Sequence, residues 1–465
     1  MPIVNSGARL DRLPLSRFHK KMLALIGAGA VVDAFDIYLA GGVVAAMTKE
    51  GFSTPVQNAT FMSATFVGMF LGAILAGVIG DRFGRRASYQ ANLLLFGLAS
   101  LAAFFAPDIQ LLTGLRFLMG LGLGAELVVA AATLGEFIPA VHRGRWGALL
   151  SMIVAAGLPL ASWLGYFLIP TFGWRWMFVV AGVGAMIIWV LRKSMPESPR
   201  WLESVGRLDE AEATMKKIEA EVESQSGPLP PVRSVTDLNV PKAPLRELFS
   251  RKLLPRLGVA SAIVMSINVT TYGFIAWLPT FFVSHGVTIV KSLGYTTTMT
   301  VGAVVGPLLA TFVADRISRI KSLVFSSAMV IAAGVVFSQL TSPEPIMAAG
   351  FVLVASAYFM VSMGQFNFVP ELFPTAYRLR GAGFASMMGR ATAIGMPFVT
   401  VFMFGTFGLV GVIATVVFML LVLIASVLAL NVETSRESLE NISNDIVPAA
   451  QGQRPVLETP KKLAA

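Results

Sequence analysis

Long apolar runs limit how this chain can fold more than any other feature of the sequence. Each run reaches the roughly 20 residues that a helix needs to cross a bilayer. The runs lie near residues 22–47, 60–80, 87–106, 110–136, 146–170, 174–192, 254–283, 293–314, 322–340, 345–369, 382–405 and 407–430. Apolar residues make up 55% of the 465 positions and charged residues 13%, which excludes a soluble multidomain protein. We therefore expect an all-α membrane protein with 12 transmembrane helices.

Basic residues are concentrated in alternate loops, and this asymmetry predicts the orientation of the helices. Cytoplasmic loops of membrane proteins carry an excess of Lys and Arg. The residues concerned are Arg9, Arg12, Arg17, Lys20, Lys21, Arg82, Arg85, Arg86, Arg143, Arg145, Arg316, Arg319, Lys321, Arg378 and Arg380. Their distribution places both termini in the cytoplasm of a bacterial inner-membrane protein. Because most of the net charge of +10 is explained by topology, we expect the lipid bilayer, and no nucleic acid, as a partner.

Three polar segments flank the apolar runs. Residues 1–21 are expected to form a cytoplasmic N-terminal segment, and residues 431–465 a cytoplasmic tail. Residues 193–253 form a central cytoplasmic loop, in which apolar residues recur every three or four positions and predict an amphipathic helix. These positions are Leu208, Ala211, Met215, Ile218 and Val222. The first apolar run is too long for a cleaved signal peptide and carries two aspartates.

The sequence lacks the residues that most enzyme chemistry needs. It contains no cysteine, and its three histidines, His19, His142 and His285, are widely separated. No Gly-Lys pair, His-Glu-x-x-His motif or Gly-x-Ser-x-Gly motif occurs, so ATP-driven work, zinc hydrolysis and serine hydrolysis are unsupported. We expect no metal and no cofactor, and a membrane enzyme or a channel is only a remote alternative.

The two halves of the chain repeat each other. Asp81-Arg82 and Asp315-Arg316 are 234 positions apart, and Glu136 and Glu371 are 235 apart. Each glutamate is followed by proline three positions later and by arginine seven positions later. The chain is therefore predicted to be a duplicated six-helix unit, with bundles at 22–192 and 254–430. Because six is even, the copies share one orientation and are related by an axis along the membrane normal.

Four motifs make this sequence resemble the major facilitator superfamily over nearly all of residues 15–435. They are Gly80-Asp81-Arg82-x-Gly84-Arg85-Arg86, Arg116-Phe117 with Gly120 and Gly124, Pro196-Glu197-Ser198-Pro199-Arg200-Trp201, and Glu371-x-x-Pro374-Thr375. Together they resemble the branch of sugar porters and bacterial metabolite:proton symporters. Asp33-Ala34-Phe35-Asp36 is similar to the Asp-Gly-Phe-Asp of aromatic-acid:proton symporters, with alanine in place of glycine. Ser318 likewise stands where the second Asp-Arg motif would have glycine. The resemblance implies a monomer that works by alternating access of two bundles.

Charged residues at the helix ends form a predicted cytoplasmic gate. An ion pair between Asp81 and the neighbouring arginines could hold the two bundles together, although the same residues also serve as a topology signal and a helix cap. The pairs Glu136–Arg143 and Glu371–Arg378 would lie symmetrically at the same level. The predicted gating residues are Asp81, Arg82, Arg85, Arg86, Glu136, Arg143, Asp315, Glu371 and Arg378.

Charges at bilayer depth are the most informative residues, because each costs several kcal/mol unless it is paired or hydrated. Asp33 and Asp36 are three residues apart and share a helix face, where two carboxylates disfavour double ionisation. With Glu126 they are the predicted proton-coupling residues. The alternatives are that Asp33 or Asp36 pairs permanently with Arg116, and that Glu126 is a structural partner of an arginine.

Arg390 is the deep cation of the second bundle, and a guanidinium binds a carboxylate through two hydrogen bonds. At the repeat spacing Arg390 corresponds to Ala155, while Asp33 corresponds to Asn268 and Asp36 to Thr271, so the halves have diverged. The predicted substrate-binding residues are Arg390, Arg116, Asn268, Thr271, Tyr272, Trp277, Gln365 and Asn367. The alternative for Arg390 is an intramembrane salt bridge to one of the acids.

These residues predict a secondary active transporter that carries a small-molecule substrate together with a proton. The leading hypothesis is symport of a small organic anion, an aromatic or hydroxylated carboxylate, across the inner membrane. The alternatives are a neutral sugar or polyol porter, and a proton-coupled exporter of cationic compounds that uses the acids as counter-ions. Arg390 argues against the exporter, because a second buried cation would repel its substrate.

Overall fold

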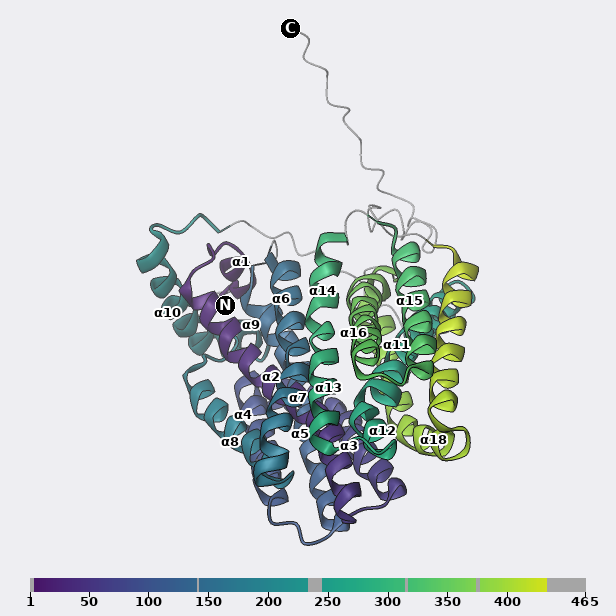
Figure 1. The fold of residues 1–465 in the computed structure, drawn as a ribbon. Coiled ribbons are helices and arrows are strands. Elements are labelled where there is room, and N and C mark those ends of the chain that lie inside the picture. The colour runs from purple at the N-terminus through teal and green to yellow at the C-terminus, as the bar shows by residue number, and fades with distance from the viewer. Residues whose placement is uncertain (1–3, 140–141, 233–244, 314–316, 374–376, 433–465) are drawn as a thin grey trace.

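The computed structural model describes residues 4–139, 142–232, 245–313, 317–373 and 377–432, and within these ranges every regular element is a helix (Figure 1). Asp315 and residues 433–465 of the predicted tail lie outside the described ranges. Nine stretches of the described residues are long and apolar enough to cross a membrane. The division into 12 spans and the cytoplasmic position of both termini stay predictions.

The N-terminal half contains one helical stretch for each of the first six apolar runs. They are α2 (Arg17–Glu50), α3 (Pro55–Phe83), α4 (Arg85–Ala103), α5 (Ile109–Phe137), α6 (Arg143–Ala155) with α7 (Gly157–Phe172), and α8 (Arg175–Leu191). Local signals set several ends: Gly51 ends α2 at φ 72°, and the carboxylate of Asp108 accepts a hydrogen bond from Leu111 N at 2.8 Å and caps α5.

The C-terminal half follows the remaining runs but is less regular. Its elements are α11 (Leu254–Asn268), η4 (Val269–Phe274), η5 (Ile275–Trp277), α12 (Leu278–Ser284), α13 (Ile289–Thr300), α14 (Gly302–Val313), α15 (Arg319–Gln339), α16 (Pro343–Met360), η6 (Val361–Phe368), α17 (Val369–Glu371) and α18 (Arg378–Leu430). The segments η4 and η6 are π-helical, a form that is frequent at functional sites. The apolar runs at 254–283 and 345–369 did not predict these breaks.

Helix α18 changes direction at Gly408, where φ is 62° and ψ is −157°. This backbone conformation is one that glycine adopts at little cost. The break falls where the two expected runs, 382–405 and 407–430, meet.

Glycines bring α3 and α5 into backbone contact. A Cβ on Gly68 would lie 2.3 Å from the carbonyl oxygen of Phe117, and a Cβ on Gly72 would lie 2.1 Å from that of Leu121. From the opposite side, a Cβ on Gly124 would lie 2.1 Å from the carbonyl oxygen of Met69. Small residues at helix interfaces allow this approach, in which van der Waals contact holds helices together within a bilayer.

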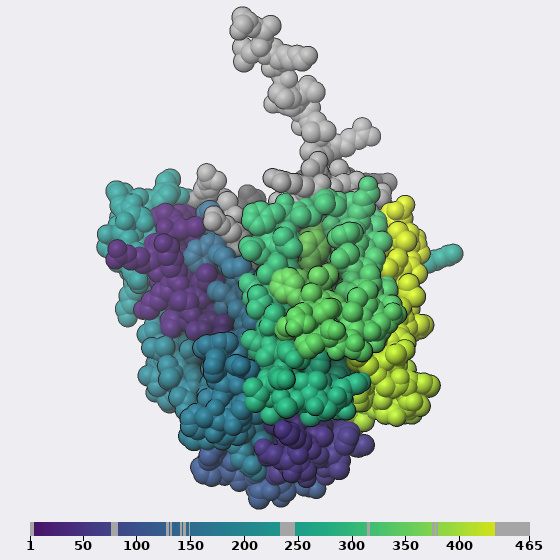
Figure 2. All heavy atoms as spheres, viewed as in Figure 1, coloured from purple at the N-terminus to yellow at the C-terminus, as the bar shows by residue number. Residues whose placement is uncertain are grey.

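The two halves lie side by side and share one apolar core (Figures 1 and 2). Ser63 Oγ on α3 donates a hydrogen bond to the carbonyl oxygen of Ile394 on α18 at 2.8 Å. A Cβ on Gly41 of α2 would lie 2.4 Å from the carbonyl oxygen of Ala276 on η5. Contacts between the halves are therefore made backbone to backbone at some points, which only small residues permit.

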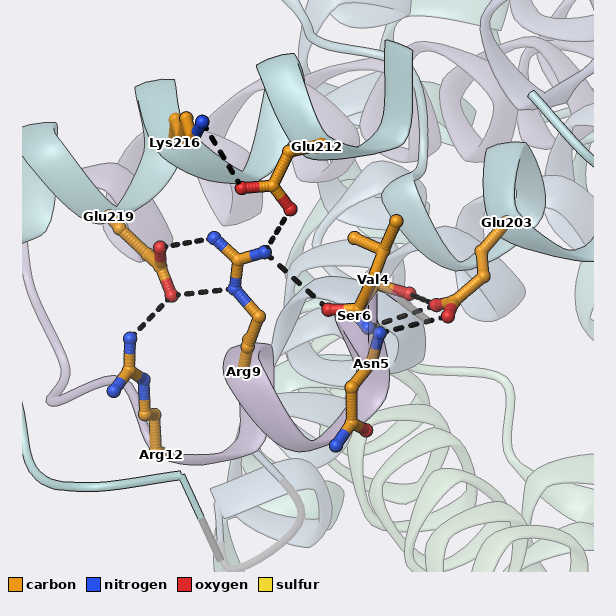
Figure 3. Close-up of polar contacts among 9 residues, drawn as sticks. All are labelled: Val4, Asn5, Ser6, Arg9, Arg12, Glu203, Glu212, Lys216 and Glu219. Carbon is orange, nitrogen blue, oxygen red and sulfur yellow. Dashed lines mark hydrogen bonds and ion pairs between the residues drawn. The ribbon is translucent and has the colours of Figure 1, made fainter. Parts of the chain in front are cut away.

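The N-terminal segment docks onto the central loop at one end of the N-terminal half (Figure 3). The elements concerned are α1 (Ser6–Asp11), α9 (Pro199–Ser204) and α10 (Leu208–Ser226). Arg9 pairs with Glu212 and Glu219, and Arg12 pairs with Glu219 at 2.6 Å. Glu203 accepts hydrogen bonds from the backbone N–H groups of Asn5 and Ser6, both at 2.9 Å.

The apolar stripe predicted for the central loop is the buried face of α10. Its residues Ala211, Met215, Ile218 and Val222 pack in one cluster with Leu10 and other residues of the N-terminal segment. In the sequence, Arg9 and Arg12 served only as evidence for the orientation of the helices. The structure shows that their ion pairs also hold the N-terminal segment against α10.

Candidate functional site

Five charged side chains of the N-terminal half are at most 1% exposed: Asp33 and Asp36 on α2, Arg116 and Glu126 on α5, and Arg192 directly after α8. Burial to this extent is rare for charged residues unless they are paired. Four of the five form two ion pairs, and Asp33 is the fifth.

Asp36 and Arg116 form the first pair. Arg116 Nη1 donates to Asp36 Oδ2, and Nη2 donates to the backbone carbonyl oxygen of Asp36 at 2.7 Å. The ring of Phe61 covers the guanidinium, with its centroid 5.3 Å from Cζ. This is the pairing that the sequence left open as an alternative to a proton-coupling Asp36 and a substrate-binding Arg116. In the arrangement described, the two charges neutralise each other.

Glu126 and Arg192 form the second pair. Arg192 begins the short 3₁₀ helix η2 (Arg192–Ser194), and its guanidinium also donates to the backbone carbonyl oxygens of Leu25 at 2.9 Å and Ile26 at 3.0 Å. The ring of Tyr89 lies 4.5 Å from its Cζ. Sequence reasoning missed Arg192, because a basic residue at the cytoplasmic end of a predicted span is expected for topology alone.

Asp33 makes no hydrogen bond or ion pair with the described residues, and its Oδ2 is buried. The charges that act on it come from Glu126, Arg192 and Asp36. Asp33 and Glu126 therefore both lie near the guanidinium of Arg192, and in the structure this guanidinium is ion-paired with Glu126.

Arg390 lies on α18 at the boundary between the halves. Its Nη1 donates to the carbonyl oxygen of Met69 on α3 at 3.3 Å, and it interacts electrostatically with Tyr272. Among the residues that the structure describes, no carboxylate lies within ion-pair distance of Arg390. The intramembrane salt bridge considered for Arg390 is therefore not formed in this arrangement.

Aromatic side chains from both halves gather around Tyr272, the tyrosine that lies near Arg390. The ring centroid of Tyr272 on η4 lies 4.5 Å from that of Phe66 on α3 and 6.4 Å from that of Tyr38 on α2. The hydroxyl of Tyr358 on α16 donates to the hydroxyl of Tyr38 at 2.7 Å. Only Tyr272 had been predicted. Tyr38 and Tyr358 are missed because the sequence does not show which helix faces meet.

The remaining predicted binding residues are not brought together. Asn268 Nδ2 donates to the carbonyl oxygen of Val264 at 2.7 Å, and Asn367 Nδ2 donates to that of Ser362 at 2.9 Å, so both amides bond within their own helical stretch. Thr271 and Trp277 are buried, and the indole Nε1 of Trp277 has no partner among the described residues. Gln365 is half-buried on η6.

Each gate glutamate pairs with an arginine that the motif spacing had not indicated, while the predicted pairs with Arg143 and Arg378 fall on side chains outside the described ones. Arg85 Nε lies 3.1 Å from Glu136 Oε1, and Arg319 Nη2 lies 3.1 Å from Glu371 Oε1. Arg85 and Arg319 are 234 positions apart, so the two pairs obey the internal repeat. Each pair joins helices of one half, and neither is a latch between bundles.

The other predicted gate residues are exposed or undescribed. Arg82 and Arg86 are exposed, and Arg86 donates to the carbonyl oxygen of Lys193 at 2.8 Å. The side chains of Asp81, Arg143 and Arg378 are not described, and Asp315 lies outside the described ranges.

A small cavity lies between the halves and ends at Tyr38. Helices α2 and α7 of the N-terminal half and η5 and α13 of the C-terminal half contribute to its wall. Its polar side chains are those of Tyr38, Ser162 and Thr296, and Gly41 and Ala276 also line it. In this arrangement the space suits little more than a water molecule, so a substrate would need the two halves to move apart.

Comparison with known proteins agrees with this architecture. The family described as "Sugar (and other) transporter" matches residues 22–446. The inner membrane metabolite transport protein YdjE of Escherichia coli is 36% identical, covering 94% of this chain and 98% of YdjE. The niacin transporter NiaP of Acinetobacter baylyi is 32% identical, covering 94% of this chain and 99% of NiaP. A solved structure of the E. coli xylose transporter XylE matches with a TM-score of 0.70 and 18% identity, covering 91% of this chain and 100% of XylE.

Proposed function

Since the chain belongs to the sugar (and other) transporter family within the major facilitator superfamily, we propose that it is a proton-coupled symporter of a small organic anion, an aromatic or hydroxylated carboxylate. It is a multi-pass membrane protein, and its relatives include proteins named as inner membrane metabolite transporters. The proposal concerns the substrate, the coupling ion and the residues that handle them.

The observation that carries the proposal is the position of Arg390. Its guanidinium lies between the halves, and its one hydrogen bond to a described residue is a long one to a carbonyl oxygen. Arg390 is half-buried. A cation that is partly desolvated and has no counter-ion is costly, and a carboxylate that binds through two hydrogen bonds would reduce the cost. The tyrosines beside it offer faces and hydroxyls to an aromatic or hydroxylated substrate. NiaP supports a carboxylate, because niacin is a pyridine carboxylic acid.

Proton coupling rests on the acids of the N-terminal half. Asp33, Asp36 and Glu126 are buried in a chain that spans a bilayer, where ionisable residues mark proton and substrate pathways. The similarity of the fold to a proton:xylose symporter gives further support. An inward proton would also gain about 2.3 kcal/mol for each 100 mV of membrane potential.

The predicted domain organisation completes the proposal. Two bundles, at 22–192 and 254–430, alternate access to the site between them while the central loop at 193–253 links them. The protein acts as a monomer with both termini in the cytoplasm. The pairs Arg85–Glu136 and Arg319–Glu371 contribute to the balance between conformations rather than to substrate contact.

Uptake into liposomes tests the substrate class. Gluconate, a hydroxylated carboxylate that crosses protein-free bilayers poorly, and xylose are offered to the purified, reconstituted protein under an imposed inward proton gradient, after a thermal-shift screen of carboxylates and sugars. We expect accumulation of the carboxylate, its loss in Arg390→Ala, and partial retention in Arg390→Lys, which keeps the charge but not the planar guanidinium.

A neutral sugar or polyol porter is the second candidate, favoured by the family description and by the fold. Accumulation of xylose by the wild type that survives Arg390→Ala would establish this candidate and overturn the organic-anion proposal.

A further inference from the structure

We propose that Asp33, Glu126 and Arg192 form a proton-release site on the N-terminal half, in which one guanidinium is the counter-ion of two carboxylates in turn. This inference rests on the proton-coupled transport proposed above. Asp33 holds the transported proton while Arg192 is ion-paired with Glu126. Arg192 is the positioning residue, because its move from one carboxylate to the other decides which acid is protonated.

Three elements position the site. Arg192 reaches from the end of α8 to the α2 backbone at Leu25 and Ile26, and to Glu126 on α5. Gly29 of α2 makes room for it, since a Cβ there would lie 2.0 Å from Arg192 Nη2 and 3.0 Å from Glu126 Oε1. Asp33 follows Gly29 by four residues and therefore lies one helical turn further along the same face of α2.

The charges of the site do not balance if both acids are ionised. Asp33 and Glu126 would carry two negative charges against one guanidinium, and each of the three side chains is at most 1% exposed. Among the described residues, no second cation acts on Asp33, and Arg85 at the nearby cavity is paired with Glu136. Tyr89 from α4 is a neutral phenol against Arg192, and Arg116 is engaged by Asp36. One proton balances the site, and Asp33 is the acid left without a hydrogen bond or an ion pair.

The internal repeat carries these charges in one half only. At the repeat spacing, Asp33 corresponds to Asn268, Glu126 to Val361 and Arg192 to Val427. Each of these neutral residues lies in a helical stretch of the C-terminal half, and Val427 is buried there. Because only one of the two repeats carries this cluster of charges, we infer that the cluster serves a function of that half alone.

A second small cavity connects Arg192 with the end of the N-terminal half that is predicted to face the cytoplasm. Tyr89, Thr133 and Arg192 line its inner part, and Arg86, Gln90 and Pro196 are among its other lining residues. Asp33 itself does not line this cavity. In the release step, the O–H bond of the Asp33 carboxylic acid breaks and the proton passes to a water that enters from the cavity beside Arg192. Arg192 then moves from Glu126 toward the new carboxylate, so that a proton taken up from the other side can neutralise the site again.

Infrared difference spectroscopy of the purified protein during a pH change tests the site without any substrate. We expect a carboxylic acid carbonyl band that is lost in Asp33→Asn. The same band should also be lost in Glu126→Gln, which leaves Asp33 intact but frees Arg192 to pair with it. Arg192→Gln should add a second carboxylic acid band, because both acids then need protons.

Glu210→Gln, an exposed carboxylate on α10, is the matched control and should leave the band unchanged. Circular dichroism and size-exclusion chromatography show whether each variant is folded. If Asp33→Asn retains the wild-type band, or if folded Glu126→Gln keeps it, the assignment to this site is wrong.

A transport measurement separates this inference from the proposed function. Gluconate, a hydroxylated carboxylate that crosses protein-free bilayers poorly, is the probe. With one proton per substrate, a gradient of one pH unit drives about tenfold accumulation of it. Asp33→Asn should reduce the accumulation ratio to about one while gluconate exchange, which needs no net proton movement, continues. An intact Asp33 band in a wild type that accumulates neither gluconate nor any other carboxylate of the screen would overturn the proposed function and leave the site standing.

Discussion

At the scale of single residues, buried charges separate into satisfied and unsatisfied groups. Asp36 and Arg116 are bonded to each other through both side chain and backbone, and Arg192 is bonded to Glu126 and to two carbonyl oxygens. Asp33 and Arg390 are not neutralised in this way. Unsatisfied charges in a low-dielectric interior are costly, so a protein that keeps them uses them for binding or for proton transfer.

The Asp36–Arg116 pair leads to a prediction about stability. Replacing Arg116 by Met leaves Asp36 buried without its partner, and we expect a loss of about 3–5 kcal/mol, seen as a large fall in the thermal unfolding midpoint. The double variant Asp36→Asn with Arg116→Met removes both charges and should recover most of the loss. Equal midpoints for the single and double variants would show that the pair contributes little.

At the scale of elements, the docking of α1 onto α9 and α10 depends on two glutamates. Partial burial alone would raise the pKa of Glu219, but the hydrogen bonds and charges of Arg9 and Arg12 outweigh it and lower this pKa. Partial burial would also raise the pKa of Glu203. The hydrogen bonds from Ser6 and Asn5 outweigh this effect and lower the pKa of Glu203. Glu203 and Glu219 therefore stabilise the docked segment fully at pH values above the ordinary glutamate pKa. This stabilisation is lost as pH falls through their lowered pKa values.

We therefore expect the N-terminal segment to undock at acidic pH. The protection of residues 4–13 against hydrogen exchange, measured relative to the intrinsic exchange rate at each pH, should be high near neutral pH. It should fall as pH drops below the ordinary range for glutamate. Glu219→Gln should give fast exchange already at neutral pH. Glu210→Gln on the same helix, where the carboxylate pairs with exposed Arg207, should behave as the wild type. Exchange that is independent of both pH and Glu219 would contradict this account.

The helices themselves follow local rules, while their irregularities do not. Within a bilayer every backbone polar group must be bonded internally, so a sufficiently long apolar run becomes a helix wherever it occurs. This explains why the apolar runs and the observed helices coincide closely. The π-helical segments η4 and η6 were not predicted, because they depend on how the C-terminal helices pack against their neighbours.

At the scale of the whole molecule, the internal repeat predicted two similar halves, and the structure adds how they meet. Helices α2, α3 and α7 of one half contact η5, α12, α13 and α18 of the other, with Tyr38 and Tyr358 bonded across the boundary. The site residues come from both sides of this boundary. A movement of one half relative to the other would therefore change the surroundings of Arg390 and of the tyrosines together.

The predicted orientation can be measured directly, because the chain has no cysteine of its own. Val56→Cys lies in the exposed first turn of α3, at the end predicted to face the periplasm, and Ser226→Cys lies at the exposed end of α10, predicted to be cytoplasmic. A membrane-impermeant thiol reagent applied to intact cells in which the outer membrane has been permeabilised should label Cys at 56 and not at 226. Labelling at 226 alone would reverse the topology.

The sequence alone determined the helical class, the apolar runs, the internal repeat and the buried face of α10, and it predicted which residues lie at bilayer depth. These features depend on the length and period of local runs, or on a spacing that can be read along the chain. Only the tertiary structure decided that Arg192 serves Glu126 over a separation of 66 residues, that Glu136 bonds Arg85, and that Tyr38 meets Tyr358. Helix formation in a membrane is a local requirement of the backbone, whereas the pairing of side chains depends on which helix faces pack together.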